Sequence, residues 1–347
     1  TKKSKFVAIL LVVFLPVCLV LIYRNMQNVS AAGEEPYSII VVAGQSNAYG
    51  EGSVQTGLSP AFGTHPGDSA TGLMYSAGNS GGTPASWGNG GTSSSILNMS
   101  NNQWNNFVGI DTPIARKAYD AGRRKVIILK VAYGGMPLRS NTDLVYGADW
   151  SPSTNGESYD KLIQRFNDLT TYLTNNGETY TVDGFYWMQG ETDAWLHAGG
   201  QYEANLNNFA SNVRTDLKMH PSAPFVLGKV SLKYCLDNLY NIFTKQNGCA
   251  LNLLFGVTSG DNTALRTAQQ SAADADPKMY IVESEDLPRS SSDWVHLNNV
   301  GVMTLGQRMF DVTSLPSRTE GSTDYDNDNI PNISEDSNSN SNLGDDD

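Results

Sequence analysis

The chain has 347 residues, of which 39% are hydrophobic and 17% are charged, and this balance is typical of a globular protein with a full core. Its formal net charge is −12 at pH 7. An acidic chain without a basic stripe argues against nucleic acid and anionic surfaces as partners, and an uncharged glycan is a better fit.

The first 33 residues have the composition of an export segment. Basic residues in Thr1-Lys-Lys-Ser-Lys precede an apolar run over residues 6–23, and small residues follow at 30–33. The run is longer than the core of a usual signal peptide and nearly long enough to span a bilayer, so cleavage near Ala31 or Ala32 and retention as a membrane anchor both stay open. The protein is therefore expected outside the cytoplasm, either secreted or anchored at the cell surface by residues 6–23.

Residues 34–318 alternate short apolar runs with amphipathic segments, as expected for one α/β domain. Runs that are short, rich in β-branched residues and bounded by turn residues predict five buried strands, over 39–43, 126–132, 182–188, 224–230 and 279–282. Periodic apolar positions predict helices over 112–121, 158–175, 202–217, 261–275 and 298–312. Pro113 is expected at the first position of the first of these helices.

Strands that alternate with helices form parallel sheets with right-handed crossovers. The expected fold is therefore a three-layer α/β/α sandwich of flavodoxin-like type, with a five-stranded, mostly parallel sheet. Ligands of such sheets bind at the carboxyl ends of the strands. Four short motifs fall at these ends: Gly44-Gln45-Ser46-Asn47, Gly134-Gly135, Gln189-Gly190-Glu191 and the segment from Asp293 to His296.

Ser46, His296 and Asp293 have the chemistry of a serine hydrolase. A serine hydroxyl becomes a nucleophile when a base takes its proton, and that base needs a third group to orient it. His296 has an acid three residues before it, whereas His65, His197 and His220 are expected to be ordinary polar residues. The alternatives are a turn or helix-capping role for Ser46 and a capping role for Asp293 and His296 before the last helix.

The order Ser, Asp, His, with the last two only three residues apart, resembles the SGNH hydrolases. Within that group, Gly44-Gln45-Ser46-Asn47, the segment Trp187-Met188-Gln189-Gly190-Glu191-Thr192-Asp193 and Asp293-x-x-His296 look most like the sialate O-acetylesterase and carbohydrate esterase family 6 proteins, over residues 37–312. The segment Gly109-Ile110-Asp111-Thr112-Pro113 departs from the Gly-Pro start that is usual before the following helix.

The resemblance implies roles for individual residues. Ser46 is the nucleophile, exposed where the first strand ends, with His296 as base and Asp293 as its orienting acid. The oxyanion donors are the backbone N–H groups of Ser46 and of Gly134 or Gly135, and the side-chain amide of Gln189. Gln45, Asn47 and Glu191 support the site, and Glu191 could orient Gln189 or the nucleophile loop.

The function that the resemblance implies is that of a carbohydrate O-acetylesterase, which needs no cofactor for catalysis. The acetylated glycan would be a xylan-type polysaccharide or a sialic acid. One alternative is a short-chain lipolytic or acyl esterase with the same triad. Another is a surface glycan-binding module whose triad is idle.

A long segment, 50–106, is rich in Gly, Ser, Thr and Asn, which predicts a functional or disordered loop. Trp87 and Trp104 within it could stack on a sugar ring or pin the loop onto the sheet. In an oxidising compartment Cys235 and Cys249 could form a disulfide, and two separate buried thiols are the alternative.

Residues 319–347 differ in character, because nine acids and no bases lie within 320–347. Oxygen-bearing side chains at alternate positions are typical of a flexible calcium loop. The pattern resembles a thrombospondin type 3 calcium repeat, with candidate ligands Asp324, Asp326, Asp328, Asn332 and Glu335. The alternative is a disordered acidic tail.

Overall fold

The computed structural model describes residues 35–53, 63, 65–78, 95–98, 108–140, 148–231, 259–290 and 295–316. Tyr37–Ser317 form one compact unit, and the other unit, Thr1–Pro36 with Arg318–Asp347, falls almost wholly outside the described residues. Also outside them lie several features expected from sequence: the export segment, Trp87, Trp104, Cys235, Cys249, Asp293 and the proposed calcium ligands of the tail.

A seven-stranded sheet forms the centre of the compact unit, in the order β3-β2-β4-β1-β5-β6-β7. The strands are β1 (Tyr37–Gly44), β2 (Gly72–Gly78), β3 (Leu97–Asn98), β4 (Val126–Tyr133), β5 (Tyr180–Met188), β6 (Phe225–Lys229) and β7 (Met279–Glu283). Six strands are parallel, and only the short β3 pairs antiparallel, with β2. The α/β fold with a mostly parallel sheet is thus confirmed.

The sheet has two strands more than the five expected. β2 lies within the segment 50–106 that was predicted as a loop, and it pairs with β4 from Gly72 to Gly78. The sequence of β2 begins and ends with glycine and contains no β-branched residue, so its local β propensity is weak. Its conformation depends on the hydrogen bonds that the neighbouring β4 offers.

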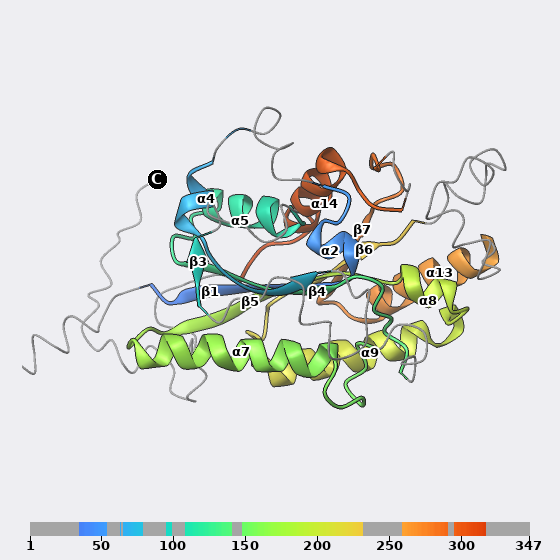
Figure 1. The fold of residues 1–347 in the computed structure, drawn as a ribbon, viewed down its shortest axis with the longest axis horizontal. Helices are drawn as coiled ribbons and strands as arrows, with labels where there is room; N and C mark the ends of the chain where they lie inside the picture. The colour runs from blue at the N-terminus through green and yellow to red at the C-terminus, as the bar shows by residue number, and fades with distance from the viewer. Residues whose placement is uncertain are drawn as a thin grey trace, which may run out of the picture. The chain divides into compact units, whose positions relative to one another are not determined.

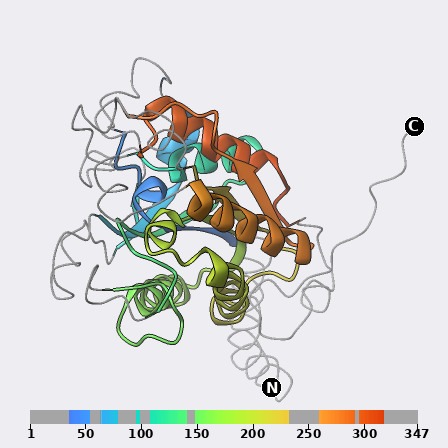
Figure 2. The ribbon, with the colours of Figure 1, turned by 90° about the vertical axis from the view of Figure 1, so that its right-hand side faces the viewer.

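Helices cover both faces of this sheet, as Figure 1 and the perpendicular view in Figure 2 show. α4 (Pro66–Ala70), α5 (Asp111–Asp120) and α14 (Asn299–Asp311) lie on one face, and α7 (Ser158–Asn175) and α9 (Gly199–Asp216) lie on the other. α13 (Ser259–Ala275) packs against α9. Two short helices, α2 (Ser46–Tyr49) and α8 (Glu191–Trp195), follow β1 and β5 directly.

The predicted helices are present, with starts that differ from the expected ones by at most three residues, the largest difference being Gly199 for α9 against the expected residue 202. α5 begins at Asp111, so Pro113 is its third residue and not its first. The missing N–H of a proline is tolerated at this position too, because the N–H groups of a first turn have no acceptor within the helix. Gly122, with a left-handed φ of +91°, follows the end of the helix, a position that favours glycine.

An aromatic cluster fixes the position of β5 against α9. Trp187 of β5 packs on Phe209 of α9 with ring centroids 4.5 Å apart, and Trp150 meets Trp187 edge-on at 5.1 Å. Phe185 stacks on Phe225 of the neighbouring strand at 4.8 Å. Rings of this size contribute large buried areas and prefer such offset and edge-to-face arrangements. The cluster holds the strand whose carboxyl end carries Gln189 and Glu191.

A buried ion pair contacts the segment that follows β1. Lys130 of β4 and Asp111 of α5 are both fully buried, and Lys130 Nζ lies 2.6 Å from Asp111 Oδ1. The same ammonium donates to the Tyr49 carbonyl at 3.1 Å. Burial lowers the pKa of Lys130 to about 8, and the nearby Asp111 carboxylate opposes that shift. Asp111, which departs from the usual Gly-Pro pattern, therefore supplies the counter-charge of this lysine.

Lys130→Met is expected to lower the free energy of unfolding by about 3–5 kcal/mol, because it leaves the Asp111 carboxylate buried without its partner. The double variant Lys130→Met with Asp111→Asn should recover part of that loss. Urea unfolding measures both. Lys125→Met is the control, since Lys125 and Glu178 form a partly exposed pair, and such pairs contribute only about 0–1 kcal/mol. Equal losses for the two single variants would contradict the role of the buried pair.

Candidate active site

The predicted motifs converge at the carboxyl edge of the sheet. Ser46 begins α2 directly after β1, the turn at Gly134 and Gly135 follows β4, and Gln189 follows β5. β1 lies between β4 and β5 in the sheet, so the turn that carries Ser46 has the other two turns as its neighbours. His296 follows β7 and precedes α14. The rule that ligands bind at the carboxyl ends of parallel strands thus applies to every described motif residue.

Glycine is required where the chain turns from β1 into α2. Gly44 has φ +137°, and a Cβ atom there would overlap the carbonyl group of Met188 on β5. Gly50, at the end of α2, has φ +97° and faces the carbonyl of Val108 equally closely. Both positions combine a positive φ with a close backbone approach, so no other residue fits them without strain. The two glycines therefore fix where Ser46 is held.

Ser46 itself is only 4% exposed, so the expectation of an exposed serine was wrong. The reason is that α2 packs against β4 and β5 as well as β1, which places its first residue below the surface. The Ser46 N–H belongs to the first turn of α2, and N–H groups there have no acceptor within the helix. The Gln45 side chain links the turn to β5, because its Oε1 accepts from the Gly190 N–H at 3.3 Å.

Asn47 joins the turn that carries Ser46 to the segment Val295–Leu297 around His296. Its Oδ1 accepts from the Leu297 N–H at 2.9 Å, and its Nδ2 lies 3.3 Å from the Val295 carbonyl. These two backbone groups flank His296. The same Nδ2 donates to Glu191 Oε1 at 2.6 Å, and both side chains are about 1% exposed. Glu191 therefore orients the Asn47 amide, and the amide positions the backbone on both sides of His296.

His296 lies close to the nucleophile turn, with its side chain 16% exposed. Its Nε2 atom is 3.5 Å from Glu51 Oε2, a contact that the sequence analysis missed. Within the described residues Ser46 Oγ makes no hydrogen bond to His296, so the pairing of these two residues as nucleophile and base stays a prediction. Because Asp293 lies outside the described residues, its role stays a prediction.

The remaining histidines have structural contacts, as expected. His65 caps α4 by accepting from the Gly67 N–H, His197 lies 2.8 Å from Asp261, and His220 accepts from the Ser222 N–H. The helix-capping alternative for His296 is not what the structure contains, because the Asn298 side chain caps α14 by accepting from the Gly301 N–H.

Gln189 is fully buried, and its amide group is held from several sides. Its Nε2 donates to Asp193 Oδ2 at 2.6 Å and lies 3.2 Å from the Met136 carbonyl, while its Oε1 accepts from Tyr202 O–H at 2.9 Å. An amide nitrogen carries two hydrogens, and both have acceptors here. To donate to an oxyanion, Gln189 would have to release one of them, so that role stays a prediction.

Asp193 is the acceptor on which this arrangement depends. It takes hydrogen bonds from the backbone N–H groups of Leu138 and Arg139 as well as from Gln189. Burial raises the pKa of Asp193 from 3.8 to about 6, and these hydrogen bonds oppose the shift. Since Leu138 and Arg139 follow the turn at Gly134 and Gly135, Asp193 links the two turns that flank Ser46.

The described residues contain no group of histidine, cysteine or carboxylate side chains that could hold a metal ion. No helix within the same residues is long and apolar enough to cross a membrane.

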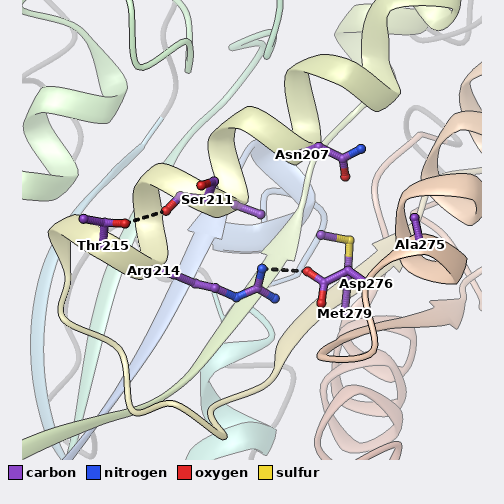
Figure 3. Close-up of a pocket in the computed structure, with 8 residues that line it drawn as sticks. Asn207, Ser211, Arg214, Thr215, Ala275, Asp276 and Met279 are labelled. Carbon is purple, nitrogen blue, oxygen red and sulfur yellow. Dashed lines mark hydrogen bonds and ion pairs between the residues drawn. The ribbon is translucent and has the colours of Figure 1, made fainter.

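A groove of about 440 Å³, lined by Asn207, Arg214 and Asp276 among others, lies between α9 and α13 (Figure 3). It reaches Met279, the first residue of β7, and so lies at the amino edge of the sheet, opposite Ser46.

Comparison with known protein families gives one match. Residues 36–314 match the family described as "Carbohydrate esterase, sialic acid-specific acetylesterase". No curated protein matches the chain in sequence.

Several solved structures share the fold. A protein of Arabidopsis thaliana has a TM-score of 0.50 and 16% identity over 79% of this chain and 96% of its own. A carbohydrate acetylesterase of Xanthomonas citri has a TM-score of 0.51 and 13% identity over 78% of this chain and 55% of its own. NanS has a TM-score of 0.50 and 17% identity over 80% and 96%. At these identities the likeness extends to the fold alone.

Asn47→Asp is expected to lower kcat for an aryl acetate by roughly 10²-fold. The new carboxylate would be repelled by the Glu191 carboxylate and could not donate a hydrogen bond to the Val295 carbonyl. The segment around His296 would therefore be displaced. In the double variant Asn47→Asp with Glu191→Gln, the glutamine amide can donate to the aspartate. The hydrogen bond between these two positions is then restored with its direction reversed. It should recover part of the lost kcat, and Asn176→Asp at the end of α7 should change nothing. If the double variant is no faster than the single one, the Glu191 contact does not position Asn47.

A second expectation concerns pH and Asp193. Because its folded pKa is raised, Asp193 contributes stability that is fully present below pH 3.8 and is lost as the pH rises through about 6. The free energy of unfolding of the wild type, minus that of Asp193→Asn, should therefore be larger at pH 4 than at pH 7, by about 2–3 kcal/mol. Urea unfolding at both pH values measures the difference, and a difference that is equal or smaller at pH 4 would contradict the raised pKa.

Proposed function

Because the chain belongs to the carbohydrate esterase family of sialic acid-specific acetylesterases, and so is a serine esterase, we propose that it releases acetate from acetylated glycans with Ser46, His296 and Asp293. The observation that carries this proposal is the Asn47 contact. Hydrogen bonds from one side chain beside Ser46 to both neighbours of His296 bring the nucleophile and the base to the same edge of the sheet.

Ester cleavage then proceeds in two similar halves. His296 Nε2 takes the Ser46 Oγ proton while Oγ bonds to the acetyl carbonyl carbon. The resulting tetrahedral intermediate loses the sugar oxygen, which takes the proton back from His296 and leaves as a free hydroxyl. Water then attacks the acetyl-Ser46 ester with the same proton transfers, and acetate departs.

The negative charge on the intermediate needs donors that are already in place. Three supports are proposed: the Ser46 N–H in the first turn of α2, the N–H of Gly134 or Gly135, and the side chain of Gln189. Glu191 and Gln45 act indirectly, through Asn47 and Gly190 respectively. None of these steps requires a metal ion or an organic cofactor.

The substrate class is an acetylated glycan, either a xylan-type polysaccharide or an O-acetylated sialic acid. The family description favours sialic acid, whereas the net charge of −12 favours an uncharged glycan. Acetate release from the two kinds of substrate, compared side by side, separates them.

Two further proposals rest on the sequence alone. Residues 1–33 direct the chain out of the cytoplasm, where the protein is secreted or is anchored by residues 6–23. The acidic tail holds a structural calcium ion through Asp324, Asp326, Asp328, Asn332 and Glu335. The esterase reaction needs neither.

Ser46→Ala and His296→Ala are each expected to lower kcat for aryl acetate by several orders of magnitude, because each removes the covalent route. The wild type should hydrolyse aryl acetate much faster than aryl octanoate and should be labelled at Ser46 by a fluorophosphonate. Ser211→Ala on α9 is the control and should behave as the wild type does.

The contrary outcomes are distinct. Wild-type turnover by Ser46→Ala would refute the mechanism. Octanoate cleaved as fast as acetate would move the assignment to a lipolytic esterase. A wild-type protein that fluorophosphonate does not label would indicate a glycan-binding module.

A further inference from the structure

Glu51 lies in the turn that directly follows the nucleophile helix. Gly50 ends α2 with a left-handed φ of +97°, which its contact with Val108 requires, and the next residues run back toward the histidine segment. Gly52 lies so close to Leu297 and to the Cβ of His296 that a side chain at Gly52 would have no room. The backbone on both sides of Glu51 is therefore fixed, one side by Val108 and the other by the His296 segment.

Tyr49 holds the Glu51 carboxylate. Its hydroxyl donates to Glu51 Oε2 at 2.7 Å, and Tyr49 is fully buried. Burial and the adjacent Glu51 charge raise the pKa of Tyr49 well above its usual range, so the phenol stays a neutral donor at any working pH. Glu51 Oε2 thus has a fixed donor on one side and His296 Nε2 on the other.

The distance of 3.5 Å between Glu51 Oε2 and His296 Nε2 is that of an ion pair once the imidazole is protonated. Nε2 is the atom that takes the Ser46 proton in the proposed mechanism. Acyl transfer turns His296 into an imidazolium at the moment Ser46 attacks. A carboxylate 3.5 Å from the charged nitrogen favours that state electrostatically.

Two other charged groups contact residues that adjoin or hold the His296 segment. Arg289 Nη1 donates to the Val295 carbonyl at 2.6 Å, and Glu191 accepts from Asn47 Nδ2 at 2.6 Å. Asp293 on the same segment lies outside the described residues. Among the groups that the structure describes, Glu51 is the carboxylate within ion-pair distance of the ring.

We propose that Glu51 is a second charge partner of His296, which stabilises the imidazolium from the Nε2 side and thereby sets the pH at which the esterase becomes active. The proposal rests on the proposed function, since it assigns Nε2 the proton of Ser46.

Glu51→Gln tests this with little disturbance, because glutamine keeps an oxygen that can accept from Tyr49 and removes only the charge. The chain has four histidines, so the C2–H signal of His296 in the proton NMR spectrum can be assigned from its loss in His296→Ala. We expect the titration midpoint of His296 to fall by roughly one pH unit in Glu51→Gln. The midpoints of His65, His197 and His220 should not move.

The kinetics provide the second readout. The acid limb of the kcat/KM profile for aryl acetate should move to lower pH by the same amount, and the plateau should fall several-fold while KM changes little. Glu51→Asp, which keeps the charge on a shorter side chain, should shift the limb less. Glu178→Gln is the matched control. The side chain of Glu178 is 30% exposed, against 27% for Glu51, and it also pairs with a cation. It precedes the amino end of β5, whereas Ser46 and His296 lie at the carboxyl edge of the sheet.

The Glu51 contact and the proposed function can fail independently of each other. An unchanged His296 midpoint in Glu51→Gln overturns the inference even if the wild type is an active acetylesterase. A lowered midpoint supports the charge contact even if acetate is not released, in which case the assigned reaction and not the Glu51 contact has failed. If Glu178→Gln shifts the titration midpoint of His296 by the same amount, the shift is an effect of the protein's net charge and not of a contact with Glu51. That result would also overturn the inference.

Discussion

The site depends on one buried side-chain amide. Asn47 contacts Glu191 after β5 and the backbone on both sides of His296, a residue about 250 positions away in the chain. Because the amide has a donor end and an acceptor end, it can bind a carbonyl and an N–H at once, which a hydroxyl or an aliphatic group of its size does less well. The position of Ser46 relative to His296 therefore depends on the side chain of a third residue, Asn47.

Charge that is buried beneath the site has the same supporting function. Lys130, which pairs with Asp111, contacts the end of α2, and Asp193 holds Gln189 and the segment after β4. Ionised groups are costly to bury unless hydrogen bonds and opposite charges compensate them, so each is surrounded by specific partners. Hydrogen bonds of this kind restrain the groups that make them, and restrained positioning is what acyl transfer requires of its donors and base.

The parts of the fold that sequence predicted well are those with a strong local pattern. β1 and β4 are largely apolar runs, with Ser38 and Lys130 as their polar members, and the apolar spacing of α7 fits a helix over 158–175, as observed. β2 was missed because its seven residues have little β propensity and form a strand only beside β4. Pro113 was placed two residues too close to the helix start because a proline fits several positions of a first turn.

The sequence by itself determined which residues have the chemistry: a serine after the first strand, a histidine before the last helix, and glycines where the chain must turn. Residue type and spacing along the chain carry that information. Only the tertiary structure decided that Asn47 contacts both neighbours of His296, that Asp111 pairs with Lys130, and that Glu51 approaches Nε2. These contacts join segments that are distant in the chain or depend on a turn held by another segment, and no local pattern encodes the distance between such groups.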